Sequence, residues 1–264
     1  MQDGIRCFEP VTAMILTYNE EANIGRMIGA LSWVDEILVI DSGSTDDTLA
    51  VIARFPKARI VTRTFDTFAQ QCNFGLTQVR TPWVLSLDAD YEVSEALSQE
   101  ICSLRPAAGV DGFRAGFTYR IFGLPLSATL YPDRVVLYRP GRARYHNEGH
   151  GHRVTVDGQV EQLRGRIYHD DRKPLERWIS SQVSYAQREA DYLLGTPRAA
   201  LRLADRLRLM GWPMPLLIMP FTLLWKRCIL DGKPGLYYAL QRLFAEAAIA
   251  CVIIDRRLRA RSTG

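Results

Sequence analysis

Two aspartates separated by one residue, in Asp88-Ala89-Asp90, have the side chains and spacing best suited to bind a metal ion. They directly follow the apolar run at residues 83–87, a pattern typical of a buried strand. Carboxylate oxygens are hard ligands that suit Mg²⁺ or Mn²⁺. We therefore expect Asp90 to ligate a divalent cation and Asp88 to bond a nucleotide or a metal-bound water. The alternative for such a pair is a solvated surface loop.

Two more acidic loops follow predicted strands. Asp41 comes at the end of the apolar run at residues 36–41, and Glu20 lies shortly after the run at residues 11–16. Because the carboxyl ends of parallel strands meet at one edge of a sheet, the three loops should face a common ligand. Asp41 could then accept a hydrogen bond from a base N–H, and Glu20 from ribose hydroxyls. Glu21 and Asp47 are instead expected to interact with helix dipoles.

The elements that must position these loops alternate along the first hundred residues. Short apolar runs predict strands at residues 11–16, 36–41, 59–62 and 83–87. Between them, Ile24, Met27, Ile28 and Leu31 recur at helical spacing, as do Phe68, Cys72, Leu76 and Val79. Ser44 or Thr45 is expected to cap a helix. This alternation predicts an α/β fold with a mostly parallel sheet and crossover helices.

The pattern changes after a predicted helix at residues 94–104, which Ser94 is expected to cap. Shorter strands are predicted at residues 112–119, 134–139, 153–156 and 166–169, and Asp157-Gly158 indicates a hairpin turn. A long helix follows at about residues 174–194, with Pro174 at its first position.

Residues 198–264 differ in character from the rest of the chain. They contain 12 Lys/Arg against 4 Asp/Glu, a net charge of +8, whereas the whole chain carries +4. An uncharged stretch at residues 210–225 holds three prolines, and a second helix is predicted at residues 236–254 with Leu240, Phe244 and Ile254 on its apolar face. We expect a catalytic domain at residues 1–197 and a helical region at 198–264 that docks on an anionic membrane. The alternative is that both helices pack on the catalytic domain.

The N-terminus and the cysteines bear on the compartment. Residues 1–10 are polar and lack the apolar core of a secretory signal, so we expect the domain to stay in the cytoplasm. The five cysteines are widely spaced without a C-x-x-C pair, which favours reduced thiols over a disulfide frame or a zinc site. No G-x-G-x-x-G or Walker loop is present, and the basic residues favour a membrane rather than nucleic acid as partner.

Four segments together resemble the donor-site motifs of glycosyltransferase family 2, in that order: ILTYNEEANI, VIDSGSTDDT, FAQQCNFGL and WVLSLDADYEV. The sequence is similar in particular to bacterial lipopolysaccharide core β-glucosyltransferases, whose chains continue into a membrane-binding helical region with a segment like Ile229-Leu230-Asp231-Gly232. One departure stands out. Such proteins often have Lys or Arg before the Asn of the third motif, but this chain has Cys72 before Asn73.

The resemblance implies a GT-A fold, inverting chemistry and a UDP-hexose donor such as UDP-glucose. It also implies an Mg²⁺ or Mn²⁺ cofactor, for which Asp90, Asp88 and His169 are the expected ligands. The expected nucleotide-sugar contacts are Thr17, Tyr18, Glu20, Asp41, Asn73 and Asp88. His169 is included because GT-A enzymes often place a late histidine on the metal.

An inverting transfer needs a base that takes the proton of the acceptor hydroxyl. Glu148 is the first choice because the segment around His146 resembles the stretch where related enzymes carry an acidic residue after a histidine. Asp133 is the reserve. A loop salt bridge is the alternative for Asp133, and a surface carboxylate is the alternative for Glu148. Arg172 and Lys173 could contact phosphates or remain solvated.

The sequence therefore predicts a metal-dependent glycosyltransferase on the cytoplasmic side of the inner membrane. Its acceptor is expected to be a lipid-linked saccharide such as lipopolysaccharide core. Two rivals are transfer to a polyprenyl phosphate, which needs no base, and a membrane-tethered nucleotide-binding module without catalysis. A nucleotidyltransferase ranks last because its glycine-rich, Arg-containing N-terminal loop is absent from the sequence.

Overall fold

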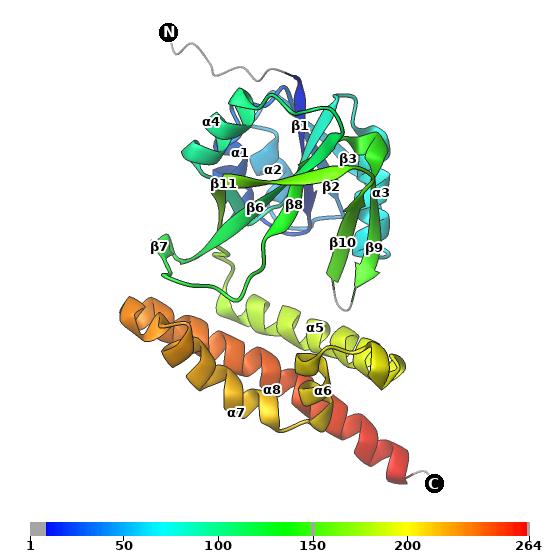
Figure 1. Cartoon of the computed structure of the whole chain (residues 1–264), viewed down its shortest axis with the longest axis vertical. Helices are drawn as coiled ribbons and strands as arrows, with labels where there is room; N and C mark the ends of the chain where they lie inside the picture. Colours follow the sequence, from blue (N-terminus) through cyan, green and yellow to red (C-terminus); the bar gives the residue numbers. More distant parts are fainter. Residues whose placement is uncertain (1–8, 149–150, 263–264) are drawn as a thin grey trace. The chain divides into compact units, whose positions relative to one another are not determined.

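The computed structural model describes residues 9–148 and 151–262, which form two compact units (Figure 1). The sheet unit comprises the described residues within Met1–Gly123, Tyr131–Asn147 and Gly151–Arg172. The helical unit comprises those within Leu124–Leu130, Glu148–His150 and Lys173–Gly264. The sequence predicts a boundary after residue 197. The compact units differ because α5 (Leu175–Gly195) packs along α8 (Gly232–Ser262).

The sheet unit is built on four parallel strands in the order β3-β2-β1-β4. These are β1 (Val11–Thr17), β2 (Glu36–Asp41), β3 (Ala58–Thr62) and β4 (Trp83–Asp88), and they confirm the four predicted strands. β1 and β2 consist mostly of apolar residues because helices cover both faces of a parallel sheet.

Four more strands extend the sheet beyond β4, in the order β8 (Arg134–Tyr138), β6 (Val110–Ile121), β11 (Gln159–His169) and β5 (Tyr91–Val93). β8 is antiparallel to β4 and to β6, whereas β11 is parallel to β6. The short strand β7 (Leu124–Pro125) falls in the helical unit. The predicted α/β fold is therefore confirmed, with a sheet that is parallel on one side and mixed on the other.

A separate two-stranded sheet joins β9 (Ala143–Glu148) to β10 (Gly151–Val156). The predicted Asp157-Gly158 hairpin is wrong, because this turn connects β10 to β11 and those strands belong to different sheets. Gly158 has φ +147°, so the sequence correctly indicated a turn at this position. Which strands pair on either side of the turn is decided by long-range contacts.

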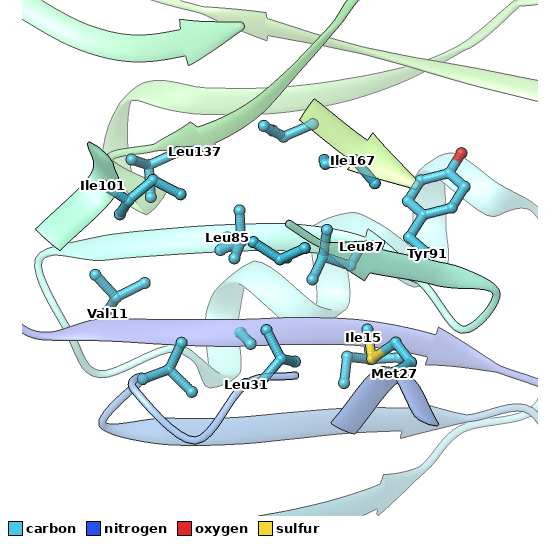
Figure 2. Packing of buried hydrophobic residues seen from close by; sticks show 14 of the residues in the cluster. Val11, Ile15, Met27, Leu31, Leu85, Leu87, Tyr91, Ile101, Leu137 and Ile167 are labelled. Carbon is cyan, nitrogen blue, oxygen red and sulfur yellow. The ribbon is translucent and has the colours of Figure 1, made fainter. Parts of the chain in front are cut away.

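The core of the sheet unit lies on both faces of the sheet because strand side chains alternate between them. Val11 and Ile15 of β1 join the cluster on one face, and Met14 joins the cluster on the other. Figure 2 shows part of the first cluster, where Leu85 and Leu87 of β4 lie beside β1 and Tyr91 lies at the end toward which β1 runs.

Helices α1 (Ile24–Gly29), α2 (Thr48–Ile52) and α4 (Glu95–Ser103) supply side chains to the first cluster, and α3 (Phe68–Gln78) supplies them to the second. The predicted cap of α4 is confirmed, since Ser94 accepts a hydrogen bond from the Leu97 N–H. The expected cap at Ser44 or Thr45 is wrong. α2 begins at Thr48, and the Ser44 hydroxyl bonds Asp41 instead. A 3-10 turn covers Pro140–Arg142.

The helical unit places α5, α6 (Leu203–Met210) and α7 (Pro213–Pro220) along α8. Short 3-10 turns cover Arg198–Ala200 and Cys228–Asp231, and α7 continues beyond Pro220 as the π-helix Phe221–Trp225. The uncharged stretch at residues 210–225 is thus irregular, as its prolines predict.

The side of α8 that packs inside the helical unit is not the apolar side predicted from the sequence. Leu240, Phe244 and Ile254 are exposed by 46%, 36% and 42%. Glu246 and Ile253 are buried instead, and Glu246 forms an ion pair of 2.6 Å with Arg208. The spacing of apolar residues identifies the apolar side of a helix, but it does not tell whether that side contacts protein, water or lipid. Within the described residues, the run Cys228–Ser262 is the helical segment long and apolar enough to cross a membrane, by length and composition.

The state of the cysteines differs from the prediction that they are reduced thiols. Cys72, Cys228 and Cys251 are free, but Cys102 is disulfide-bonded, so the prediction of reduced thiols is wrong for that residue. A disulfide can join cysteines far apart in sequence, and the absence of a C-x-x-C pair does not exclude one.

Candidate active site

The acidic loops meet at the carboxyl ends of three neighbouring strands. The register pairs Thr17 with Asp41 across β1 and β2, and Leu16 with Asp88 across β1 and β4. Asp41 and Asp88 therefore flank the end of β1, as the sequence predicts.

Asp41 uses its carboxylate to fold its own loop. The side chain is 1% exposed and accepts hydrogen bonds from the backbone N–H groups of Gly43 at 2.8 Å and Ser44 at 3.0 Å. Gly43 has φ +92°, a conformation that glycine adopts without steric cost. The carboxylate expected to meet a base is thus engaged within the protein, and its contact with a nucleotide stays a prediction.

Asn19 joins the first two loops and was missed in the sequence. Its side-chain Oδ1 accepts the backbone N–H of Thr45 at 2.6 Å, and its own N–H donates to the Ser44 hydroxyl at 2.8 Å. Asn19 has φ +55°, a left-handed conformation that asparagine tolerates better than most residues. This preference is the signal that could have identified it.

Asn23 connects the first loop to the segment that follows β11. It is fully buried, and its amide donates to Glu20 and to Asp171, both at 3.0 Å. Its carbonyl oxygen accepts the backbone N–H of Arg172 at 3.0 Å. Glu20 thus lies at the predicted edge, held by a residue that the sequence did not single out.

Asp90 and His169 lie side by side although they are 79 residues apart in sequence. β5 and β11 are antiparallel, and their register places His169 opposite Tyr91, the residue after Asp90. Asp90 Oδ2 and His169 Nε2 are 3.2 Å apart, and the two side chains are 15% and 14% exposed. Two of the three expected metal ligands are therefore brought together.

The surroundings of His169 favour a positive charge there. Burial lowers the pKa of His169, but the charge and hydrogen bond of Asp90 outweigh this, helped by the charges of Asp171 and Asp88, and the pKa rises above its ordinary 6.5. Rings of Tyr119, Tyr131 and Tyr91 lie 4.6, 5.0 and 5.2 Å from the imidazole, centroid to centroid. Burial raises the pKa of Tyr91 and Tyr131, which are neutral phenols.

These residues fit a divalent cation that shares its coordination with a ligand. His169 Nδ1 is buried and has no hydrogen-bond partner among the residues described. Across residues 9–148 and 151–262, no group of three His, Cys, Asp or Glu side chains forms a complete metal site. Asp90 and His169 would supply part of the coordination, and phosphate oxygens and water the rest, which is how Mg²⁺ is usually bound at phosphate sites. Asp88 is half-buried at the end of β4.

The side chain of Asn73 is hydrogen-bonded to the backbone of Tyr145. Its amide Nδ2 donates to the Tyr145 carbonyl at 3.0 Å, and its Oδ1 accepts the Tyr145 N–H at 2.9 Å. This pair of bonds fixes β9 to α3, which lies beside β10 (Figure 1). The predicted contact of Asn73 with a nucleotide therefore competes with a structural role.

A buried polar cluster lies next to this pair of bonds. The Tyr145 hydroxyl bonds Tyr138 at 2.5 Å and Ser86 at 2.8 Å, and the His152 ring lies 5.2 Å from the Tyr145 ring. Cys72 is 1% exposed, and burial raises the pKa of its thiol. A lysine or arginine at position 72 would have to bury its charge in this cluster, which the cysteine avoids.

The remaining candidate residues differ in their surroundings. Thr17 is buried, and its hydroxyl has no hydrogen-bond partner in the described part of the chain, whereas Tyr18 is 54% exposed. Asp133 is exposed and lies next to Gly116. Arg172 pairs with the buried Asp170 at 2.7 Å. The backbone of Glu148 ends β9, but its side chain lies outside the described residues, and Lys173 belongs to the helical unit.

The family model described as "Glycosyl transferase family 2" matches residues 12–113, which hold β1 to α4 with the Asp41 and Asp88-Ala89-Asp90 loops. This match supports the predicted family for residues 12–113, and the sheet order agrees with the predicted α/β fold with a mostly parallel sheet.

Two relatives illustrate the range of sequence similarity. The lipopolysaccharide core biosynthesis glycosyltransferase LpsC of Rhizobium meliloti (strain 1021) is 29% identical over 191 residues, which cover 69% of this chain and 71% of LpsC. An uncharacterized glycosyltransferase of Rickettsia felis is 37% identical over 94 residues, or 35% of this chain and 33% of that protein.

Among solved structures, S. aureus TarS 1–349 is similar with a TM-score of 0.49 and 13% identity, covering 91% of this chain and 90% of that one. Glucosyl-3-phosphoglycerate synthase from Mycobacterium tuberculosis, in complex with Mn²⁺, UDP and glucosyl-3-phosphoglycerate, gives a TM-score of 0.46 at 17% identity, covering 74% and 84%.

Proposed function

We propose that this chain, a glycosyltransferase whose family 2 domain spans residues 12–113, moves a hexose from a UDP-sugar to a lipid-linked saccharide such as lipopolysaccharide core. The observation that carries the proposal is the half-buried Asp90–His169 pair, 3.2 Å apart, beside the strand end that holds Asp88. A carboxylate and an imidazole at the carboxyl edge of a sheet form a site for a cation and a phosphate-bearing ligand.

Asp90 and His169 hold the reacting end of the donor in this proposal, and the neighbouring tyrosine rings exclude water from one side of the imidazole. A divalent cation, Mg²⁺ or Mn²⁺, would offset the negative charge that grows on the diphosphate as its bond to the sugar breaks. Thr17, Tyr18, Glu20, Asp41, Asn73 and Asp88 remain the proposed contacts of the nucleotide-sugar.

Transfer with inversion also needs a proton acceptor on the side of the incoming hydroxyl. We assign this role to Glu148, with Asp133 as the reserve. The acceptor oxygen bonds the anomeric carbon and gives its proton to the carboxylate, while the diphosphate leaves with the electrons of the broken bond.

The nature of the acceptor is proposed from two observations. LpsC, named for lipopolysaccharide core biosynthesis, is similar over most of this chain. The helical unit also exposes large apolar side chains, including Trp212 by 62%, Leu224 by 64% and Trp225 by 77%, and the cations Lys226 and Arg227 directly follow Trp225. Exposed tryptophans flanked by basic residues suit the interface of an anionic membrane. We propose peripheral docking at the cytoplasmic face of the inner membrane.

Peripheral docking fits α8 better than a membrane span. Glu246 lies near the middle of the run Cys228–Ser262, and its side chain is buried in ion pairs with Arg208 of α6 and Arg242. A helix that crosses the bilayer alone would have to leave this cluster and expose the charges to lipid. The exposed apolar stripe of α8 can instead lie along the membrane surface while the charged side stays packed.

The test is release of nucleoside diphosphate from a panel of UDP-, GDP- and TDP-sugars, with membrane lipid extract as acceptor. We expect turnover of one donor that requires Mn²⁺ or Mg²⁺ and is abolished by Asp90→Ala. Asp157→Ala, which removes an exposed carboxylate elsewhere in the sheet unit, should retain activity. Metal-dependent nucleotide binding without turnover of any donor would show a nucleotide-binding module instead.

A further inference from the structure

Arg134, at the start of β8, is a half-buried cation without an ion-pair partner among the described residues. Its guanidinium carbon lies 4.6 Å from the centroid of the Tyr131 ring, so one face of the group is covered by an aromatic ring. A cation–π contact contributes about 0.5–2 kcal/mol, less than the cost of removing a charge from water.

Other half-buried arginines of the sheet unit are paired. Arg139, at the end of the same strand, also lies over an aromatic ring, 4.5 Å from Trp83, but it forms ion pairs with Glu9 at 3.2 Å and Asp111 at 3.4 Å. Arg120 pairs with Glu92 at 3.5 Å. Arg134 thus has the aromatic contact of Arg139 without an ion pair to a carboxylate, and a half-buried charge in this state is a suitable binding group for an anion.

The position of Arg134 identifies where that anion would bind. The Tyr131 ring that contacts Arg134 also packs 5.0 Å from the His169 ring, and the Tyr131 and Tyr91 hydroxyls are hydrogen-bonded to each other. One aromatic side chain therefore separates Arg134 from the Asp90–His169 pair. β8 is antiparallel to β4, with Leu137 opposite Leu85, so the start of β8 that holds Arg134 lies at the end of β4 that holds Asp88.

We propose that Arg134 binds the diphosphate of the nucleotide donor and stabilises it as the leaving group. The inference rests on the proposed function of this site. When the bond from the anomeric carbon to the diphosphate oxygen breaks, its electron pair stays on that oxygen, and the guanidinium offsets the added charge without exchanging a proton.

This assignment also accounts for Cys72. The family motif often carries a cation before Asn73, but in this chain position 72 is buried in the polar cluster around Tyr145. Arg134 supplies a positive charge from a different strand, which no pattern in the third motif reveals. Its planar guanidinium can donate two parallel hydrogen bonds to a phosphate, which a lysine ammonium cannot reproduce.

The test compares nucleoside diphosphates with the matching nucleosides, UDP with uridine, GDP with guanosine and TDP with thymidine, by titration calorimetry in Mg²⁺. For the nucleotide that the wild type binds, Arg134→Gln should weaken diphosphate binding about 10–100-fold and nucleoside binding less than about threefold. Arg134→Lys should fall between the two. Arg139→Gln is the matched control and should leave both affinities unchanged, and thermal melts confirm that each variant is folded.

Several results would overturn the assignment. Equal loss of diphosphate and nucleoside binding in a folded Arg134→Gln would indicate a general effect on the pocket. Unchanged diphosphate affinity with a raised KM for the lipid acceptor would show that the cation serves an anionic acceptor group. If the wild type turns over a donor but Arg134→Gln does so equally well, only this inference fails. If the wild type binds no nucleotide, it fails together with the proposed function.

Discussion

Replacing Asn73 with alanine should destabilise the sheet unit before it affects any ligand. The change removes both hydrogen bonds to the Tyr145 backbone, of 3.0 and 2.9 Å, and Tyr145 is only 5% exposed. A buried backbone group left without a partner costs about 1–3 kcal/mol. Two such groups, partly relieved by water, give an expected loss of about 2–4 kcal/mol in the free energy of unfolding, or roughly 5–15 °C in Tm.

Urea denaturation followed by tryptophan fluorescence measures this loss, and calorimetry with the nucleotide measures affinity on the same samples. Asn73→Asp keeps an acceptor for the Tyr145 N–H but places a carboxylate oxygen against its carbonyl, so it should not restore stability. Gln70→Ala, an exposed amide on the same helix, is the matched control and should change stability by less than about 0.5 kcal/mol. Unchanged stability of Asn73→Ala together with a tenfold or greater loss of nucleotide affinity would refute the structural role and support a direct contact.

Three further predictions concern packing and charge. Arg208→Ala should lower the free energy of unfolding by about 3–5 kcal/mol in urea denaturation, because it leaves the buried Glu246 without its ion-pair partner Arg208. A loss below about 1 kcal/mol would contradict the ion-pair cluster. Gly75→Ala should cost about 1–3 kcal/mol, since its Cβ would lie 2.5 Å from Met14 Sδ, whereas Gly29→Ala meets nothing within 4 Å and should be neutral or stabilising. Burial lowers the pKa of His152 below its ordinary 6.5, so the unfolded state binds the proton more tightly and stability should fall as pH drops below 6.5. His152→Phe should remove up to about 1.4 kcal/mol per pH unit of that dependence, and identical pH profiles would count against the burial effect.

The order of strands and the acidic edge were predictable because they depend on local patterns. Apolar runs identified β1 to β4, and the rule that strand ends converge placed Asp41 and Asp88 on either side of β1. The Ser94 cap followed from one residue and its neighbours.

What could not be predicted depends on contacts between distant segments. The chain order suggested His169 as a ligand, but its 3.2 Å approach to Asp90 arises from the pairing of β11 with β5. Asn73 was recognised as part of a motif, yet its binding of Tyr145 was not visible in the sequence. The spacing of apolar residues also could not tell whether the apolar side of α8 faces a core or a membrane. Sequence reasoning missed Arg134, because its lack of an ion-pair partner among the described residues is visible only in the structure.

The metal and nucleotide site is tested most directly by diffraction from crystals grown with Mn²⁺ and UDP, using the anomalous signal of manganese. We expect one peak within coordination distance, about 2.0–2.3 Å, of both an Asp90 carboxylate oxygen and a His169 ring nitrogen, with the diphosphate completing the coordination. Bound UDP with manganese elsewhere, or with no manganese near Asp90 and His169, would contradict it.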